Sequence, residues 1–188
     1  MLREIRNAFV ACAITFVMCS VVYPALVWGV ARVAFPRQSE GSLIRGRDGV
    51  VIGSELIAQP FASDAYFHPR PSAVDYKADA AGGSNLGTRN HDLRTQVAAR
   101  AEALGATFDN PAPLDLVTAS GGGLDPDISP EAAYFQVARV ASARKMDEVK
   151  LRDLVARRVD RAGATLGAPP RINVLLLNMA LDAESASQ

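Results

Sequence analysis

An uncharged apolar run near the N-terminus constrains the fold of this chain more than any other feature. From Ala8 to Ala31 the sequence reads AFVACAITFVMCSVVYPALVWGVA, without one charged residue. A helix needs roughly 20 apolar residues to cross a bilayer, and this run has that length. Because the apolar part of a cleaved signal peptide is usually only ~7–15 residues long, the run favours an uncleaved anchor. We therefore predict a short tail at residues 1–7, a transmembrane helix at 8–35 and a single compact soluble domain at 36–188.

The charges on either side of this run nearly balance, so they do not decide its orientation. Arg3 and Arg6 precede the run, and Arg32 and Arg37 stand at its far end. The excess of Lys and Arg that usually marks the cytoplasmic side is therefore almost absent. Since the preceding tail is short and a large polar domain follows, we expect a cytoplasmic N-terminus and an extracytoplasmic domain.

The composition of the chain argues against several classes of function. Its 188 residues carry 20 Lys and Arg against 20 Asp and Glu, so no strong field favours nucleic acid or an acidic partner. His68 and His91 are the only histidines, which limits catalytic and metal chemistry. Cys12 and Cys19 would lie about 10 Å apart along one helix, beyond the ~7 Å Cα separation that a disulfide spans.

Local sequence signals predict a hairpin and three helices after the anchor. Asp48-Gly49 between two short apolar runs is typical of a β-hairpin. Asn90, Ser129 and Asp147 are each suited to the N-cap of a helix, and a proline follows Ser129 at the first helical position. The apolar residues after each of these caps recur at helical spacing, so we expect helices there.

Two further apolar stretches are expected to be strands. DLVTASGGG, residues 115–123, is typical of a short strand that runs into a loop. RINVLLLNMALD, residues 171–182, follows two prolines and suits a buried strand, although such runs are ambiguous between strand and helix. Because strands and helices mix without strict alternation, we predict an α+β domain.

The glycine-rich segment AAGGSNLGTRNHDL, residues 80–93, raises the question of a phosphate site. A P-loop needs a Lys-Ser or Lys-Thr pair after its glycines, and this segment has none. A dinucleotide-binding loop must follow a strand, which the preceding residues do not form. A structural turn is therefore favoured. Asp125 and Asp127 resemble the start of a calcium loop but lack its glycine and final glutamate, so we expect no metal site there.

Nucleophilic catalysis is the alternative that the residues leave open. Ser84 or Ser120 could act with His68 or His91 in a membrane-anchored extracytoplasmic hydrolase. Neither serine stands in a G-x-S-x-G nucleophile elbow, and these residue types occur in most proteins. We therefore keep the hydrolase as the second hypothesis.

Three long blocks of this sequence resemble one family. They are FHPRPSAVDYKADAAGGSNLGTRNHDL (67–93), DLVTASGGGLDPDISPEAAYFQVARVASAR (115–144) and PPRINVLLLNMALD (169–182). In this order behind one N-terminal apolar helix, they are similar to the C subunit of Kdp-type potassium-transporting ATPases. The resemblance covers nearly the whole chain.

The resemblance implies an accessory, non-catalytic subunit of an ATP-driven potassium uptake complex in the cell inner membrane. The partners would be an ATP-hydrolysing P-type subunit and a potassium-binding pore subunit. Members of the family are described as catalytic chaperones that raise the ATP affinity of the ATPase subunit, and a glutamine has been proposed as their ATP contact. The matching residue is Gln136, whose alternative interpretation is an amide bonded to backbone. The chain would hold no cofactor, metal ion or catalytic residue of its own.

The same resemblance places the domain over the outer mouth of the pore subunit, where ATP is absent. Direct ATP contact and an extracytoplasmic domain therefore conflict, and an effect on ATP would have to travel through the partners. The irregular, aromatic-containing stretch at residues 62–87 is expected to be ordered and to dock on a partner. The candidate docking residues are Ser84, Asn85, Leu86, Gly87, Tyr66, Phe67 and Tyr76.

Overall fold

The N-terminal residues form one long helix in the computed structural model, which describes residues 1–46 and 48–185. Helices α1 (Leu2–Val17) and α2 (Tyr23–Ala34) are joined by one wider turn, the π-helix η1 (Met18–Val22). Pro24 explains this turn, because its ring would clash with the carbonyl four residues earlier in a regular helix. The helix thus begins at Leu2 rather than at residue 8.

The helix from Leu2 to Ala34 is long and apolar enough to cross a membrane, by length and composition. A signal sequence near an N-terminus passes the same test. Both cysteines are exposed on this helix and form no disulfide. The predicted apolar helix is therefore confirmed.

The chain forms two compact units, residues 1–52 and 53–188. In the first, α2 is followed by the short helix α3 (Pro36–Ser39) and by strand β1 (Leu43–Arg45). Strand β1 pairs with β2 (Val51–Ser54), within which the first unit ends. The predicted hairpin is therefore confirmed. In its turn the Asp48 carboxylate accepts a hydrogen bond from the Val50 N–H at 3.1 Å.

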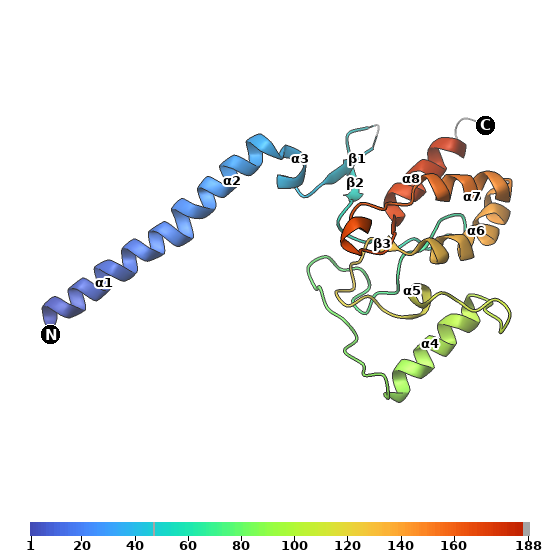
Figure 1. The fold of residues 1–188 in the computed structure, drawn as a ribbon, viewed down its shortest axis with the longest axis horizontal. Coiled ribbons are helices and arrows are strands. Elements are labelled where there is room, and N and C mark those ends of the chain that lie inside the picture. The colour runs from blue at the N-terminus through green and yellow to red at the C-terminus, as the bar shows by residue number, and fades with distance from the viewer. Residues whose placement is uncertain (47, 186–188) are drawn as a thin grey trace. The chain divides into compact units, whose positions relative to one another are not determined.

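Three helices and two very short strands build the core of the second unit (Figure 1). The helices are α6 (Pro130–Arg144), α7 (Glu148–Arg157) and α8 (Val174–Ser185). Strand β3 (Asp127–Ile128) pairs antiparallel with β4 (Ile172–Asn173), with Ile128 opposite Ile172. The fully buried residues of this core include Val137, Val140, Leu151, Val155, Ile172, Leu177 and Leu181.

All three predicted helix starts are confirmed. The side chains of Asn90, Ser129 and Asp147 accept hydrogen bonds from the N–H groups two or three residues later, as N-caps do. The helix after Asn90 is α4 (His91–Ala103). With the two small sheets, these helices give the mixed helix-and-strand architecture that the sequence indicated.

Two predicted strands are instead helices, each for a physical reason. Residues 114–117 form the single turn α5 (Leu114–Val117), which buries Leu116 and Val117. Only Ile172 and Asn173 of the C-terminal apolar run are in a strand, and α8 follows at once. The Asn173 side chain accepts a hydrogen bond from the Leu176 N–H and so starts that helix. The apolar run is long enough for three helical turns, and six residues of α8 are buried.

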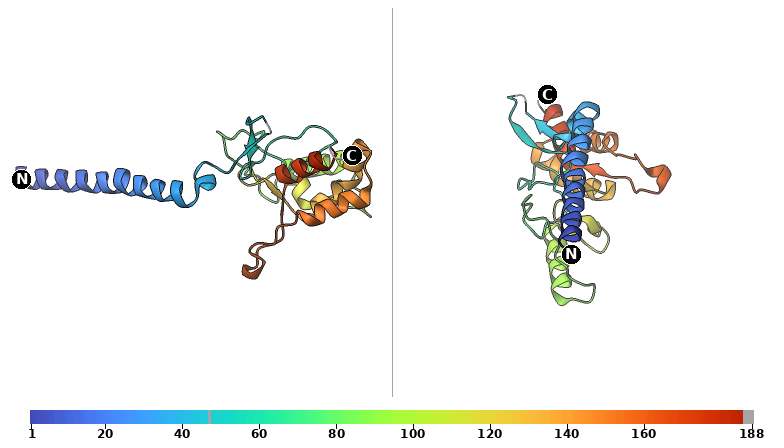
Figure 2. Two further views of the ribbon diagram at one scale, coloured as in Figure 1. Left: turned by 90° about the horizontal axis from the view of Figure 1, so that it is seen from above. Right: turned by 90° about the vertical axis from the view of Figure 1, so that its left-hand side faces the viewer.

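Helix α4 and the loop at residues 161–170 extend away from this core. Helix α4 lies apart from α6, α7 and α8 in Figure 1, and none of the residues described in it is buried. The loop at 161–170 carries the short 3-10 helix η2 (Ala164–Leu166) and projects from the helices in Figure 2. Its base is held by backbone hydrogen bonds in both directions between Asp160 and Arg171.

Candidate functional site

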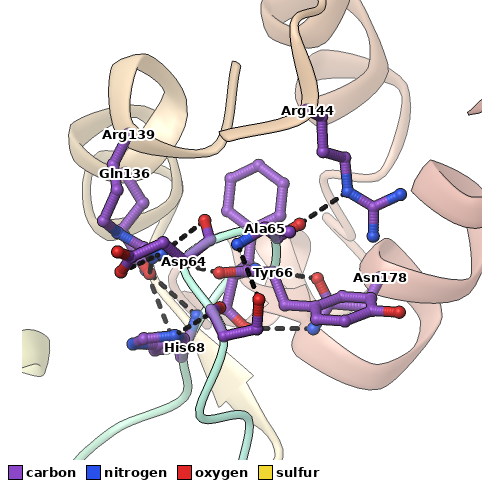
Figure 3. Close-up of polar contacts among 10 residues, drawn as sticks. Asp64, Ala65, Tyr66, His68, Gln136, Arg139, Arg144 and Asn178 are labelled. Atoms are coloured by element: carbon purple, nitrogen blue, oxygen red, sulfur yellow. Dashed lines mark hydrogen bonds and ion pairs between the residues drawn. The ribbon is translucent and has the colours of Figure 1, made fainter. Parts of the chain in front are cut away.

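The segment at residues 64–68 is irregular backbone that lies against α6 and α8 (Figure 3). Its centre is Phe67, whose side chain is 0% exposed. Asn178 of α8 accepts a hydrogen bond from the Phe67 N–H and donates one to the Phe67 C=O, both at 2.9 Å. Since buried backbone groups need partners and no strand of the described residues pairs with this segment, the Asn178 amide takes the place of a neighbouring strand.

Gln136 of α6 repeats this arrangement one residue later. Its Oε1 accepts from the His68 N–H at 2.8 Å, and its Nε2 donates to the His68 C=O at 3.1 Å. Nε2 also donates to the Ala132 C=O, and Oε1 also accepts from Arg139. Gln136 is 2% exposed. The structure thus agrees with the alternative interpretation of Gln136, an amide bonded to backbone, and its contact with ATP stays a prediction.

Two arginines of α6 complete the hold on this segment. Arg139 donates to the C=O groups of Asp64 and Tyr66, and Arg144 donates to the C=O of Ala65. Together with Asn178 and Gln136, they give every carbonyl from residue 64 to 68 a side-chain donor. Arg144 also lies 4.6 Å from the centre of the Tyr66 ring. We call residues 64–68 the clamped segment.

Burial shifts the pKa values of two side chains at the clamped segment. Burial lowers the pKa of Arg139, but an arginine remains protonated at any physiological pH. Burial is also the main reason why the pKa of His68 lies below its usual value of 6.5, although its hydrogen bond to the Ser63 carbonyl opposes the shift. The neutral form of His68 is therefore favoured in the folded protein.

A cavity of about 430 Å³ opens beside the clamped segment. Its lining includes Pro60, Phe61, Pro69 and Pro71, together with residues of α4 and α5. We call it the proline-lined cavity. Gln136 and His68 form part of its lining, and so does Tyr76. Two residues that the sequence predicted for different roles, Gln136 for ATP and Tyr76 for docking, therefore meet at one place.

A second cavity, of about 640 Å³, lies elsewhere, between the base of the 161–170 loop and α7. Its charged side chains are largely paired: Arg171 lies 3.5 Å from Asp127 and 3.2 Å from Asp160, and Arg157 lies 2.6 Å from Glu184. Burial is the main reason why the pKa of Asp127 is raised. Neighbouring residues thus already bind most of its charges, so the proline-lined cavity is the stronger candidate site.

The glycine-rich loop has a structural use. The Gly82 N–H donates to the Gly122 C=O, and a Cβ on Gly83 would lie 2.5 Å from the Gly121 carbonyl oxygen. A Cβ on Gly123 would lie equally close to Val74. The glycines of residues 82–83 and 121–123 therefore allow two backbone segments to touch. This agrees with the prediction of a structural turn.

The predicted docking residues differ in their exposure. Ser84, Asn85 and Gly87 are exposed, and Leu86 is half-buried. Tyr66 and Tyr76 are half-buried as well, with their hydroxyls bonded to Asp182 and to the Arg70 carbonyl. The Phe67 side chain is different, because it has no exposed area with which to contact a partner.

The catalytic pairs of the hydrolase hypothesis are not formed. In the part of the chain that the structure describes, no hydrogen bond joins Ser84 or Ser120 to either histidine. Ser120 is buried, and its hydroxyl has no partner there. His91 is exposed and contacts Thr95 of its own helix. Across residues 1–46 and 48–185, no group of three or more His, Cys, Asp or Glu is placed to hold a metal ion.

Sequence reasoning missed the roles of Arg139, Arg144 and Asn178. One signal could have found Asn178 and strengthened the case for a structural Gln136: each amide interrupts a run of apolar residues, in LLLNMAL and in YFQVARV. A polar side chain at such a position is usually buried and hydrogen-bonded. The two arginines have no comparable local signal.

Comparison with known proteins identifies the family. The family model described as "K+-transporting ATPase, c chain" matches residues 5–183. The chain is 48% identical to a "Potassium-transporting ATPase KdpC subunit" of Rhodopseudomonas palustris, over 97% of this chain and 98% of that protein. Proteins of the same name from Caulobacter vibrioides and Gloeobacter violaceus are 47% and 45% identical, over 97% and 96% of this chain and 94% and 96% of theirs. The chain therefore belongs to the KdpC family, the c chains of K+-transporting ATPases.

Proposed function

We propose that this chain is a non-catalytic accessory subunit of an ATP-driven potassium uptake complex. The observation that carries the proposal is the family match over residues 5–183. The apolar helix from Leu2 to Ala34 supports a single-pass anchor in the cell inner membrane. The partners are the ATP-hydrolysing P-type subunit and the potassium-binding pore subunit. The N-terminus is cytoplasmic, and the folded domain lies on the extracytoplasmic side, docked on the pore subunit.

The chain raises the ATP affinity of the ATPase subunit indirectly, through its partners. The hydrogen bonds of Gln136 support this version, because its amide oxygen and nitrogen are both bonded within the chain. An ATP contact would have to break bonds that hold His68. Coupling between distant sites requires a partner that exists in two states, which a docked domain can favour or disfavour.

Co-purification from mild detergent tests the assignment as a subunit. We expect the full-length chain to be recovered with two multi-span partners and with potassium-stimulated ATP hydrolysis. A variant that lacks residues 2–34 serves as the control for the anchor. Recovery of the full-length chain alone, under conditions that keep other membrane complexes intact, would contradict the proposal.

A reporter at the C-terminus tests the topology. Alkaline phosphatase is active only outside the cytoplasm, and so we expect activity from a C-terminal fusion and none from a fusion before Met1. The reverse pattern would place the domain in the cytoplasm and would restore direct contact with nucleotide as an option.

The Gln136→Ala variant separates direct from indirect effects on ATP. If Gln136 acts only by holding the fold, Gln136→Ala should change the KM for ATP only as far as this subunit is lost from the complex. Asn178→Ala is the matched control, because it removes the amide that holds the neighbouring residue of the clamped segment. A raised KM in fully assembled complexes of Gln136→Ala alone would show direct contact with ATP.

A further inference from the structure

We propose that the proline-lined cavity binds an apolar side chain next to a carboxylate, supplied by an extracytoplasmic segment of a partner subunit. This inference rests on the proposed function, because it needs a partner on the same side of the membrane. The size, the lining, the charge and the surroundings of the cavity each support it.

The lining favours an apolar occupant. Most of it consists of proline rings, Phe61, Leu104, Leu116 and two alanines, and the cavity of about 430 Å³ falls within the usual range for binding sites. Binding pockets are mostly apolar, with a few polar groups that fix the orientation of the ligand. Here those groups are the side chains of Tyr76, His68 and Arg100.

The charge of the cavity favours a carboxylate beside the apolar group. Among the described residues that line it there is no Asp or Glu, whereas Arg100 brings a positively charged guanidinium group. Arg100 donates to the Val117 C=O at 2.9 Å and to Gln96 Oε1 at 3.4 Å, which are both neutral acceptors. No carboxylate in the described chain lies within ion-pair distance of it. The planar fork of Arg100 is suited to an incoming carboxylate.

The backbone beside the cavity is held in an unusual conformation. Asp75 and Tyr76 have φ angles of 53° and 58°, so two consecutive non-glycine residues are left-handed. This region is disfavoured for residues with a Cβ, and such strain gathers at binding and catalytic sites. The Ser72 hydroxyl holds the turn by accepting from the Val74 and Tyr76 N–H groups at 3.1 and 3.0 Å. The turn places the Tyr76 ring in the wall of the cavity.

The surroundings favour a protein segment over a small free molecule. One wall of the cavity is α4, in which no described residue is buried. Beyond α4, Phe108 is 100% exposed and Leu114 is 71% exposed. A free carboxylate would fill the cavity and leave these groups in water. A segment of a partner that enters the cavity would also cover α4 and this apolar surface.

Photo-crosslinking in the assembled complex tests the inference directly. Benzoylphenylalanine replaces Ala103, which lines the cavity, or Ala143, an exposed residue of α6, as the matched control. We expect position 103 to crosslink to a partner peptide that contains Asp or Glu beside an aromatic or aliphatic residue, at a yield at least fivefold above position 143. Crosslinks from 103 to lipid only, or at the yield of the control, would overturn the inference. If the complex still co-purifies in that case, the proposed function is unaffected.

Charge reversal gives a second test. Arg100→Glu should reduce retention of this subunit in the complex at least tenfold, and Arg100→Lys should reduce it less. Arg94→Glu changes the charge of an exposed residue of the same helix and should have no effect. Since Arg100 also bonds to Val117, the thermal unfolding of each purified full-length variant is compared. Retention of a folded Arg100→Glu variant at the wild-type level would contradict the proposal, and recovery through a partner Asp→Arg or Glu→Arg exchange would support it.

Phenylacetate tests the remaining alternative, that the occupant of the cavity is a small free molecule with an apolar group and a carboxylate. With the full-length chain in detergent, we expect no saturable thermal shift up to about 1 mM phenylacetate, because phenylacetate cannot also cover α4 and the exposed apolar residues beyond it. A saturable shift that Arg100→Glu abolishes, together with no partner crosslink from position 103, would replace the partner segment with a small-molecule ligand.

Discussion

Helices α6 and α4 begin with equally good caps, yet they have opposite environments. The Ser129 hydroxyl caps α6, and the Asn90 amide caps α4. Helix α6 buries six residues in the core and binds the clamped segment with three side chains. None of the described residues of α4 is buried, and the helix packs mainly against α5.

The difference shows that a cap determines where a helix starts but not what holds it. Isolated helices of this length are marginal in water, so most of the stability of a helix comes from the surface it buries. Helix α6 obtains that surface from its own chain. We infer that α4 obtains part of it from a partner, as the proline-lined cavity beside it suggests.

Asn178→Ala should have the largest effect of any change considered. It leaves the buried N–H and C=O of Phe67 without partners, and each unpaired group costs about 1–3 kcal/mol, so we expect a loss of about 2–6 kcal/mol. Ser84→Ala, in the exposed connection to α4, should change stability by less than about 0.5 kcal/mol. Urea unfolding of both variants measures the difference. Equal midpoints would show that the clamped segment contributes nothing.

The same Val→Ala substitution should lower the free energy of unfolding more in α6 than in α4. Val137 in α6 is fully buried, and Val137→Ala is expected to lower the free energy of unfolding by about 2–3 kcal/mol. Val97 in α4 is half-buried, and Val97→Ala should cost less than about 1 kcal/mol. A similar cost at the two positions, measured in the isolated chain, would mean that α4 already packs as well as α6.

A single added methyl group can test whether the close contact between the two glycine segments contributes to stability. Gly83→Ala places a Cβ about 2.5 Å from the Gly121 carbonyl oxygen and should cost about 1–3 kcal/mol, as overpacking does. Gly87→Ala lies in the same loop with nothing within 4 Å of its new Cβ, and it should be nearly neutral. Thermal unfolding of the pair is the measurement. A neutral Gly83→Ala would show that the two loops can separate freely.

Removal of each cap compares α4 with α6 at their ends. Ser129→Ala should lower global stability by about 1 kcal/mol, because α6 belongs to the core. Asn90→Ala should leave global unfolding nearly unchanged and instead speed amide hydrogen exchange within α4. Exchange that rises across α6 and α8 in Asn90→Ala would contradict the independence of α4.

The pH dependence of His68 is expected to be the smallest effect. Burial lowers its pKa in the folded state, so the unfolded chain binds more protons near pH 6.5. The contribution of His68 to stability is therefore complete well above pH 6.5 and declines as the pH falls toward its lowered folded value. His68→Gln should remove this slope between pH 7 and 5, while His91→Gln should keep it. An unchanged slope in His68→Gln would assign it to other groups.

Some features of the fold could be predicted from sequence because their signals are local. The apolar helix, the Asp48-Gly49 hairpin and the three caps depend only on neighbouring residues, and all are present. The resemblance of three sequence blocks to one family was confirmed by the family match. In contrast, the run at 171–182 is mostly helix rather than the predicted strand, because the periodicity of an apolar run does not separate a buried strand from a buried helix.

By itself, the sequence determined the membrane-compatible helix, the helix starts and the family, since each depends on residue types at short spacing. Tertiary structure alone decided which groups meet. It brought Gln136 to His68 across 68 residues and Asn178 to Phe67 across 111, and so made both amides part of one clamp, while the ATP contact of Gln136 stays a prediction. It also enclosed the proline-lined cavity between segments that are distant in sequence. The physical reason is that buried polar backbone must find partners wherever the fold supplies them, and no local pattern records where that is.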